Sequence, residues 1–273
     1  MITIPEQYLL TTGLDAHGER LSKGELYSLY KRLPAELSIN DEHDLSRPSV
    51  AVARNFKFVP LGALDWAISA EVTVEDENIL RARGGFSFSW LAASYTVYPD
   101  RQSDLEILFN PRVFDAEFCI GLTAKSDETI NIVSRELKQK GLAPDAILII
   151  QFVTAAAVSG FLGKPASDLY DRLMQSLKDG AEKHKNDKQQ NVKLQFLIPE
   201  NLNPLNAVIL LEVPSEHIEH LRVGSLSFQD AVEIAKSVPY AKDVKKIVIS
   251  TTGSPPIWQL QSYQKATGLI IRI

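Results

Sequence analysis

The feature that most constrains the fold of this sequence is a run of eighteen uncharged residues, 146–163, which reads AILIIQFVTAAAVSGFLG. As a helix rising 1.5 Å per residue it would cover roughly 27 Å, against a membrane core of about 30 Å. The polar residues Gln151, Thr154 and Ser159 make the run less apolar than a typical membrane anchor. A helix that is apolar nearly all round has to be buried, either inside a domain or in lipid.

The pattern of residues 146–163 favours one buried helix. Asp145 is suited to cap its start, and Gly163, followed by Pro165, suits its end. Small side chains spaced four residues apart form a ridge along one side of this helix, in two rows: Ala155, Ser159 and Gly163, and Ala156 and Gly160. Such a ridge lets another backbone approach closely.

The residues predicted to contact a partner or a membrane are therefore Ala156, Gly160 and Gly163. The alternative for the first half of the run is a strand from Ile147 to Val153, because these residues are mostly β-branched or aromatic. Periodicity does not separate the two forms in so short an apolar run.

The rest of the sequence predicts an α+β protein with two portions. Residues 1–112 form a largely antiparallel β portion with one amphipathic helix, and residues 113–273 form a mixed α/β portion built around the buried apolar helix. Apolar and polar residues alternate in 49–60 and 66–74, which predicts strands with one face in a core.

The helix of the first portion is predicted over 22–33. Ser22, with Glu25 three residues later, matches a capping box.

In the second portion, helices and strands are expected to alternate. A strand is predicted over 118–123, a helix over 127–140, an amphipathic helix after residue 165, and a solvated connector over 182–191. The remaining predicted elements are strands over 192–198, 207–213, 244–250 and 268–273 and a helix over 226–237.

Composition narrows the functional classes. A net charge of -5 and a pI of about 5.6 argue against a protein that binds nucleic acid by neutralising phosphates. The single cysteine, Cys119, excludes an internal disulfide and is expected to be a buried structural thiol. A chain with one cysteine and no disulfide suits a reducing compartment. Together with the lack of a signal-peptide pattern at the start of the chain, this predicts a cytoplasmic protein, with membrane association retained as an alternative.

Candidates for chemistry are few. His217 and His220 lie three residues apart, a spacing that places two metal ligands on one helix face. Two histidines do not complete a tetrahedral zinc site, and no third ligand is evident, so we predict no metal and no cofactor. No phosphate-binding, dinucleotide-binding or nucleophile-elbow motif occurs in the sequence.

These observations lead to three functional hypotheses. The first is a non-enzymatic interaction or regulatory protein, in which 146–163 packs in the core or against a protein partner or a second copy. The alternatives are a protein that inserts 146–163 into a membrane, and an enzyme whose class the sequence does not reveal.

Overall fold

The computed structural model of the chain describes residues 2–14, 20–40, 45–46, 49–74, 88–89, 103–109, 114, 116–123, 131–136, 139–140, 146–163, 168–188, 191–239, 243–266 and 270–273. By its internal contacts the chain divides into two compact units. Unit 1 comprises Met1–Ala92 and Lys138–Ala143, and unit 2 comprises Ala93–Leu137 and Pro144–Ile273. The boundary that we place between residues 112 and 113 stays a prediction.

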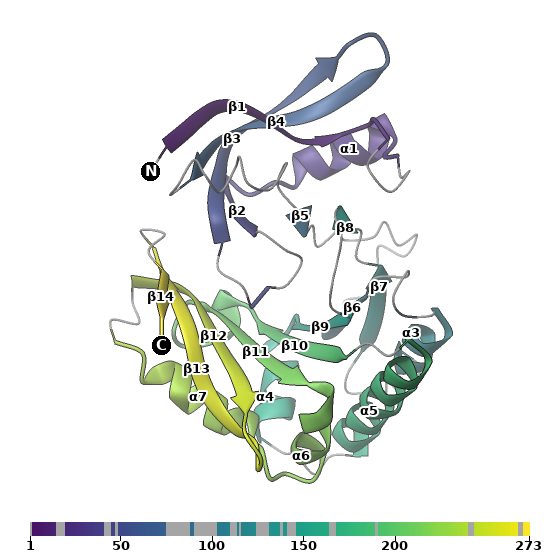
Figure 1. Cartoon of the computed structure of the whole chain (residues 1–273), viewed down its shortest axis with the longest axis vertical. Helices are drawn as coiled ribbons and strands as arrows, with labels where there is room; N and C mark the ends of the chain where they lie inside the picture. Colours follow the sequence, from purple (N-terminus) through teal and green to yellow (C-terminus); the bar gives the residue numbers. More distant parts are fainter. Residues whose placement is uncertain are drawn as a thin grey trace. The chain divides into compact units, whose positions relative to one another are not determined.

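Unit 1 contains a four-stranded antiparallel sheet with the strand order β1-β4-β3-β2 (Figure 1). Its strands are β1 (Ile2–Thr11), β2 (Glu36–Asn40), β3 (Ser49–Leu61) and β4 (Asp65–Val74). Alternate residues of β4 are at most 2% exposed: Ile68, Ala70, Val72 and Val74. The strands predicted over 49–60 and 66–74, with one buried face, are confirmed.

A bulge in β3 explains how that strand keeps its apolar residues on one face. The register of β3 against β4 shifts between Arg54 and Lys57, and Asn55 has a positive φ of 54°. Asparagine tolerates this left-handed conformation better than most residues. The extra residue brings Ala53 and Phe56 into the same apolar cluster although they are three positions apart.

Among the described residues of unit 1 the helix is α1 (Lys23–Lys31), and it begins where the sequence predicts. The Ser22 hydroxyl accepts from the backbone N–H of Glu25 (3.2 Å), and the Glu25 carboxylate accepts from the N–H of Ser22 (2.8 Å). The capping box is therefore confirmed. Leu26 and Leu29 pack with Leu10 and Ile68, which fixes α1 on the buried face of the sheet. A short antiparallel pair, β5 (Phe88–Ser89) with β8 (Gln139–Lys140), also belongs to this unit.

Unit 2 is built on an eight-stranded mixed sheet with the order β14-β13-β12-β11-β10-β9-β6-β7. Neighbours pair in parallel in β6·β7, β9·β10 and β11·β12, and antiparallel elsewhere. The strands are β6 (Leu105–Phe109), β7 (Ile132–Glu136), β9 (Ala146–Phe152), β10 (Val192–Ile198), β11 (Val208–Pro214), β12 (Val244–Thr252), β13 (Ile257–Lys265) and β14 (Ile270–Arg272). Together the two sheets and the helices confirm the predicted α+β class.

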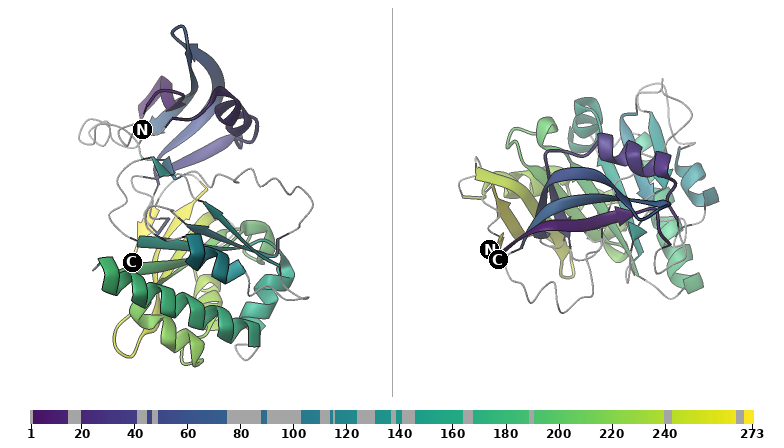
Figure 2. Two further views of the ribbon diagram at one scale, coloured as in Figure 1. Left: turned by 90° about the vertical axis from the view of Figure 1, so that its right-hand side faces the viewer. Right: turned by 90° about the horizontal axis from the view of Figure 1, so that it is seen from above.

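The helices of unit 2 lie on one side of this sheet (Figures 1 and 2). They are α3 (Ala116–Thr123), α4 (Ala155–Gly163), α5 (Asp168–Lys188), α6 (Ile218–Arg222) and α7 (Phe228–Lys236), with short 3₁₀ turns η1 (Glu200–Leu202) and η2 (Ser215–His217). Their buried residues form one hydrophobic cluster with the alternate strand residues that face them, such as Leu148, Phe196 and Ile249.

The structure corrects the prediction of one apolar helix over 146–163. Ala146–Phe152 is the strand β9, and only Ala155–Gly163 forms a helix, α4. Strand β9 pairs with β6 on one side and β10 on the other. It is apolar on both faces because both are buried, which is typical of a central strand. The hydrogen bonds to these neighbours decide against a helix, and a single segment does not reveal them.

Three other predictions in unit 2 are wrong. The expected strand over 118–123 belongs to the helix α3, and the expected helix over 127–140 contains β7, which pairs with β6. The expected connector over 182–191 is largely helical, because α5 continues to Lys188.

Among the described residues, no helix is both long and apolar enough to cross a membrane.

Candidate functional site

The residues predicted to contact a partner lie on α4, but the ridge they form is not in the core. Thr154 caps this helix, its hydroxyl accepting from the N–H of Ala157 (3.2 Å) and donating to Asp104 (2.8 Å). On the opposite side of α4, Val158 and Phe161 point into the core. Ala156 is exposed and Gly160 is half-buried. Gly163 is the last residue of α4.

The candidate metal ligands do not share one helix face. His217 ends the 3₁₀ turn η2, whereas His220 lies in α6. Nδ1 of His217 lies 2.8 Å from the hydroxyl of Thr251, which is 3% exposed. A hydroxyl beside an imidazole is the arrangement of an activated nucleophile, but a buried Thr251 offers no access to a substrate. This contact holds η2 against the end of β12.

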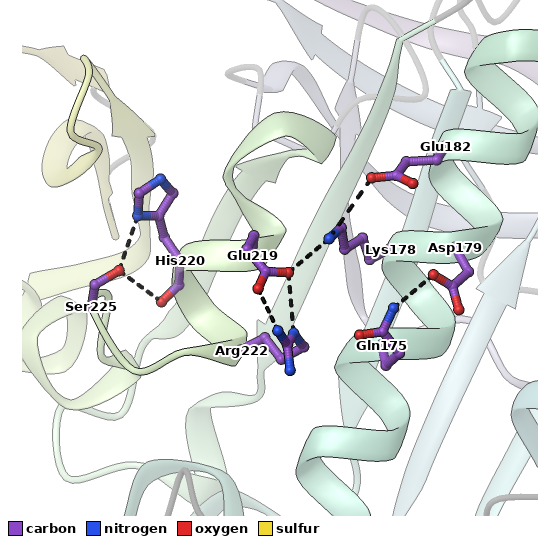
Figure 3. Close-up of polar contacts among 8 residues, drawn as sticks. All are labelled: Gln175, Lys178, Asp179, Glu182, Glu219, His220, Arg222 and Ser225. Carbon is purple, nitrogen blue, oxygen red and sulfur yellow. Dashed lines mark hydrogen bonds and ion pairs between the residues drawn. The ribbon is translucent and has the colours of Figure 1, made fainter.

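His220 makes a separate hydrogen bond on the surface (Figure 3). Its Nδ1 lies 2.9 Å from the Ser225 hydroxyl, which itself donates to the carbonyl oxygen of His220 (3.2 Å). Since the Ser225 proton is used on that carbonyl, Nδ1 of His220 is the donor to Ser225. A serine whose oxygen accepts a hydrogen bond from histidine is not activated as a nucleophile, because activation requires histidine to accept the serine proton. Among the described residues, no group of three His, Cys, Asp or Glu side chains is placed to hold a metal.

The charged contacts around His220 connect two helices. Glu219 of α6 accepts from Lys178 of α5 (2.9 Å) and from Nε of Arg222 (3.1 Å), as Figure 3 shows. The hydrogen bonds from Arg222 and then Lys178 lower the pKa of Glu219 to about 2. Beside them the buried hydroxyl of Tyr170 donates to the carbonyl of Leu221 (3.1 Å), and burial raises the pKa of this phenol. All these groups are paired within unit 2, which indicates a structural role.

The strongest candidate for a functional site is a cluster of aromatic rings on unit 1, which we call the aromatic surface. It consists of four rings and two lysines from α1, β3 and β4: Lys23, Tyr27, Tyr30, Lys31, Phe58 and Trp66. Tyr27 is 43% exposed, and the other three rings are half-buried. Adjacent ring centroids lie between 4.8 and 6.2 Å apart, the range of favourable aromatic pairs.

Trp66 is covered on both faces of its ring. Phe58 stacks on it with a centroid distance of 4.8 Å and an interplanar angle of 16°. The ammonium group of Lys23 lies 3.5 Å from the centroid of the indole. A cation so close to the centroid would collide with a stacked ring on the same side, so Phe58 and Lys23 occupy opposite faces. The cation–π contact also offsets the unfavourable position of Lys23, a cation in the first turn of a helix.

Helical spacing explains how α1 presents this surface. Lys23, Tyr27 and Lys31 are four residues apart and so form one stripe along the helix. Tyr30 lies three residues from Tyr27, between this stripe and the buried Leu26 and Leu29. Lys31 lies 5.4 Å from the centroid of the Tyr27 ring. We did not single out the stripe in the sequence, although the Lys-Tyr-Lys spacing beside a capping box was a signal for it.

The charge of the aromatic surface is positive. Among the described residues, no carboxylate oxygen lies within 4.0 Å of the ammonium groups of Lys23 or Lys31. The nearby carboxylates are already used: Glu25 caps α1, and Asp65 accepts from the Thr12 hydroxyl (2.9 Å) and from Arg20 (3.1 Å). The surface therefore combines one exposed and three half-buried rings with two cations that can receive an anion.

Comparisons with known proteins give no match: no family model, no curated protein and no solved structure is similar to this chain.

Proposed function

We propose that this chain is a non-enzymatic interaction protein that binds a protein partner through the aromatic surface of unit 1. The observation that carries the proposal is the 43% exposure of Tyr27 within a cluster of four rings. Exposed aromatic clusters on soluble domains mark sites that become buried in complexes. Tyrosine and tryptophan are also the residues that most often dominate the binding energy of protein interfaces.

The rings are suited to this use because they are held in place before any partner arrives. Each of Tyr27, Tyr30 and Trp66 contacts Phe58, so little rotamer entropy is left to lose on binding. The underlying cluster of Leu10, Leu26, Leu29 and Ile68 fixes α1 against the sheet. A rigid aromatic centre with a polar rim is the usual anatomy of a protein interface.

The ridge on α4 belongs to the same proposal as a second contact. The exposed Ala156 and the half-buried Gly160 leave room for a close approach of another backbone, with Gly163 at the end of the helix. The cytoplasm, predicted from the sequence, is the proposed location of the complex.

A photocrosslinking experiment tests the proposal. Tyr27 is replaced in the full-length chain by a benzophenone amino acid, and the protein is irradiated in its native cells. The matched control places the same group at Tyr8 of β1, which is 48% exposed and has no ring partner among the described residues. We expect a discrete crosslinked protein at position 27 that is absent at position 8.

Equal crosslinking at the two positions would show that exposure alone produces the products. The aromatic surface would then have no partner, and the proposed function would be wrong.

A further inference from the structure

We infer that the partner segment bound by the aromatic surface is an acidic peptide in which an apolar side chain lies between two carboxylates. This inference rests on the proposed function and names the chemistry of its partner. Lys23 and Lys31 flank Tyr27 at four residues on either side, and neither ammonium is paired with a carboxylate among the described residues.

The spacing of the two lysines in the stripe sets the spacing of the two carboxylates in the peptide. From Lys23 to Lys31 the helix α1 rises eight residues, or about 12 Å at 1.5 Å per residue. An extended peptide covers about 13 Å in four residues. Two carboxylates four positions apart in an extended segment therefore match the spacing of the two lysines along the helix axis. The residue midway between them then lies over the exposed ring of Tyr27.

The geometry disfavours a single-stranded nucleic acid, which also combines with rings and lysines. Nucleic-acid platforms stack bases on open aromatic faces. Here both faces of Trp66 are occupied, one by Phe58 and the other by the ammonium of Lys23. The largest ring of the surface thus has no face for a base, whereas carboxylates need only the lysine ammonium groups.

The local charge of this surface is opposite to that of the whole chain. The chain carries a net charge of -5, whereas the two lysines place positive charge beside the rings and attract an acidic segment there. A second copy of the chain is itself acidic and could occupy the same surface. The experiment therefore has to distinguish self-association from peptide binding.

The experiment measures fluorescence anisotropy of labelled probes with the full-length protein. The main probe is an extended peptide with two aspartates four positions apart and a phenylalanine midway. Its matched control carries asparagines in place of the aspartates, and a labelled oligothymidine tests for nucleic acid. The test variant is Lys23→Glu with Lys31→Glu. The control variant is Lys57→Glu, an exposed lysine of the same unit that neighbours Ser69 in the sheet and lies outside the aromatic surface.

We expect the double reversal to weaken binding of the acidic peptide by about tenfold or more, since tenfold corresponds to about 1.4 kcal/mol. Lys57→Glu should change it less than twofold, and added salt should weaken binding to the wild type. A peptide with lysines in place of the aspartates should bind the double variant better than the wild type. That gain would show that the variant is folded.

Three results would overturn the inference: equal binding of the asparagine peptide, binding of the oligothymidine that the double reversal abolishes, or self-association in sedimentation that the same reversal abolishes. Failure of the proposed function looks different, because it appears as equal crosslinking at positions 27 and 8. A position-27 crosslink unaffected by the double reversal would leave the partner in place and refute only its acidic chemistry.

Discussion

Both units of this protein contain a network of aromatic rings, but the two networks differ in exposure. In unit 2, Phe228 lies at the centre of four rings at 4.8 to 6.4 Å, those of Phe161, Tyr170, Phe196 and Trp258. All five are at most 7% exposed. In unit 1, Phe58 is the centre of three rings, and Tyr27 is 43% exposed.

The same ring-to-ring geometry occurs in two different settings. In unit 2 the rings fill the space between the sheet and the helices, so their burial stabilises the fold. In unit 1 smaller side chains already fill the core beneath α1, and the rings lie at its edge. The energy of burying Tyr27 is therefore still available for binding.

The largest loss of stability is expected from Phe228→Ala. Removing a fully buried ring with four ring neighbours leaves a cavity and should lower the free energy of unfolding by about 3 to 5 kcal/mol. Chemical denaturation monitored by circular dichroism measures this. A loss below about 1 kcal/mol would erase the distinction between the buried and the exposed network.

A smaller loss of stability is expected when the capping serines of two helices of equal length are replaced. Ser22 caps α1 and Ser227 caps α7, and each helix has nine residues. Ser22→Ala and Ser227→Ala should each cost about 1 kcal/mol. The effect at Ser22 should be the larger because its hydroxyl belongs to a reciprocal capping box. The reverse order, measured by the same denaturation, would show that α1 is not anchored by its cap.

A third prediction contrasts the paired charges of unit 2 with the unpaired lysines of the aromatic surface. Glu219→Gln should cost less than about 1 kcal/mol near pH 7, because Glu219 and its partners are partly exposed to solvent. The pKa of Glu219 is lowered to about 2 from an ordinary value of 4.5. Its contribution is therefore complete above pH 4.5 and is lost as the pH falls toward 2.

The measurement is the difference in denaturation midpoint between wild type and Glu219→Gln as a function of pH. Lys23→Gln, at an ammonium group without a carboxylate partner among the described residues, is the control. The difference in midpoint between wild type and Lys23→Gln should not change as the pH falls from 4.5 toward 2. A difference for Glu219→Gln that grows toward low pH would refute the ion network.

Local signals predicted the parts of the fold that depend on neighbours in sequence. The capping box of Ser22 and Glu25 located α1, and the alternation in β4 located its buried face. On α4, the four-residue spacing placed Ala156 and Gly160 on one side of a helix, and Val158 and Phe161 on the other side are buried.

Contacts distant in sequence decided the rest. The run 146–163 becomes a strand in its first half because β6 and β10 offer hydrogen bonds on both sides. Ile132 and Val133 form β7 for the same reason, beside β6. The sequence did not predict the aromatic surface either, because Phe58 and Trp66 come from two strands that only the fold brings to α1.

The most direct test of the central claim is to bind the partner identified by crosslinking to Tyr27→Ser and to Tyr8→Ser. Both changes remove an exposed tyrosine from unit 1. Tyr27→Ser also removes ring contacts worth about 0.5 to 1.5 kcal/mol of folding free energy, so binding is compared at a temperature at which both variants are folded. We predict that Tyr27→Ser weakens binding of the purified partner about tenfold or more while Tyr8→Ser leaves it unchanged. Equal affinities of the two variants for that partner would contradict the claim that the aromatic surface of unit 1 is an interaction surface.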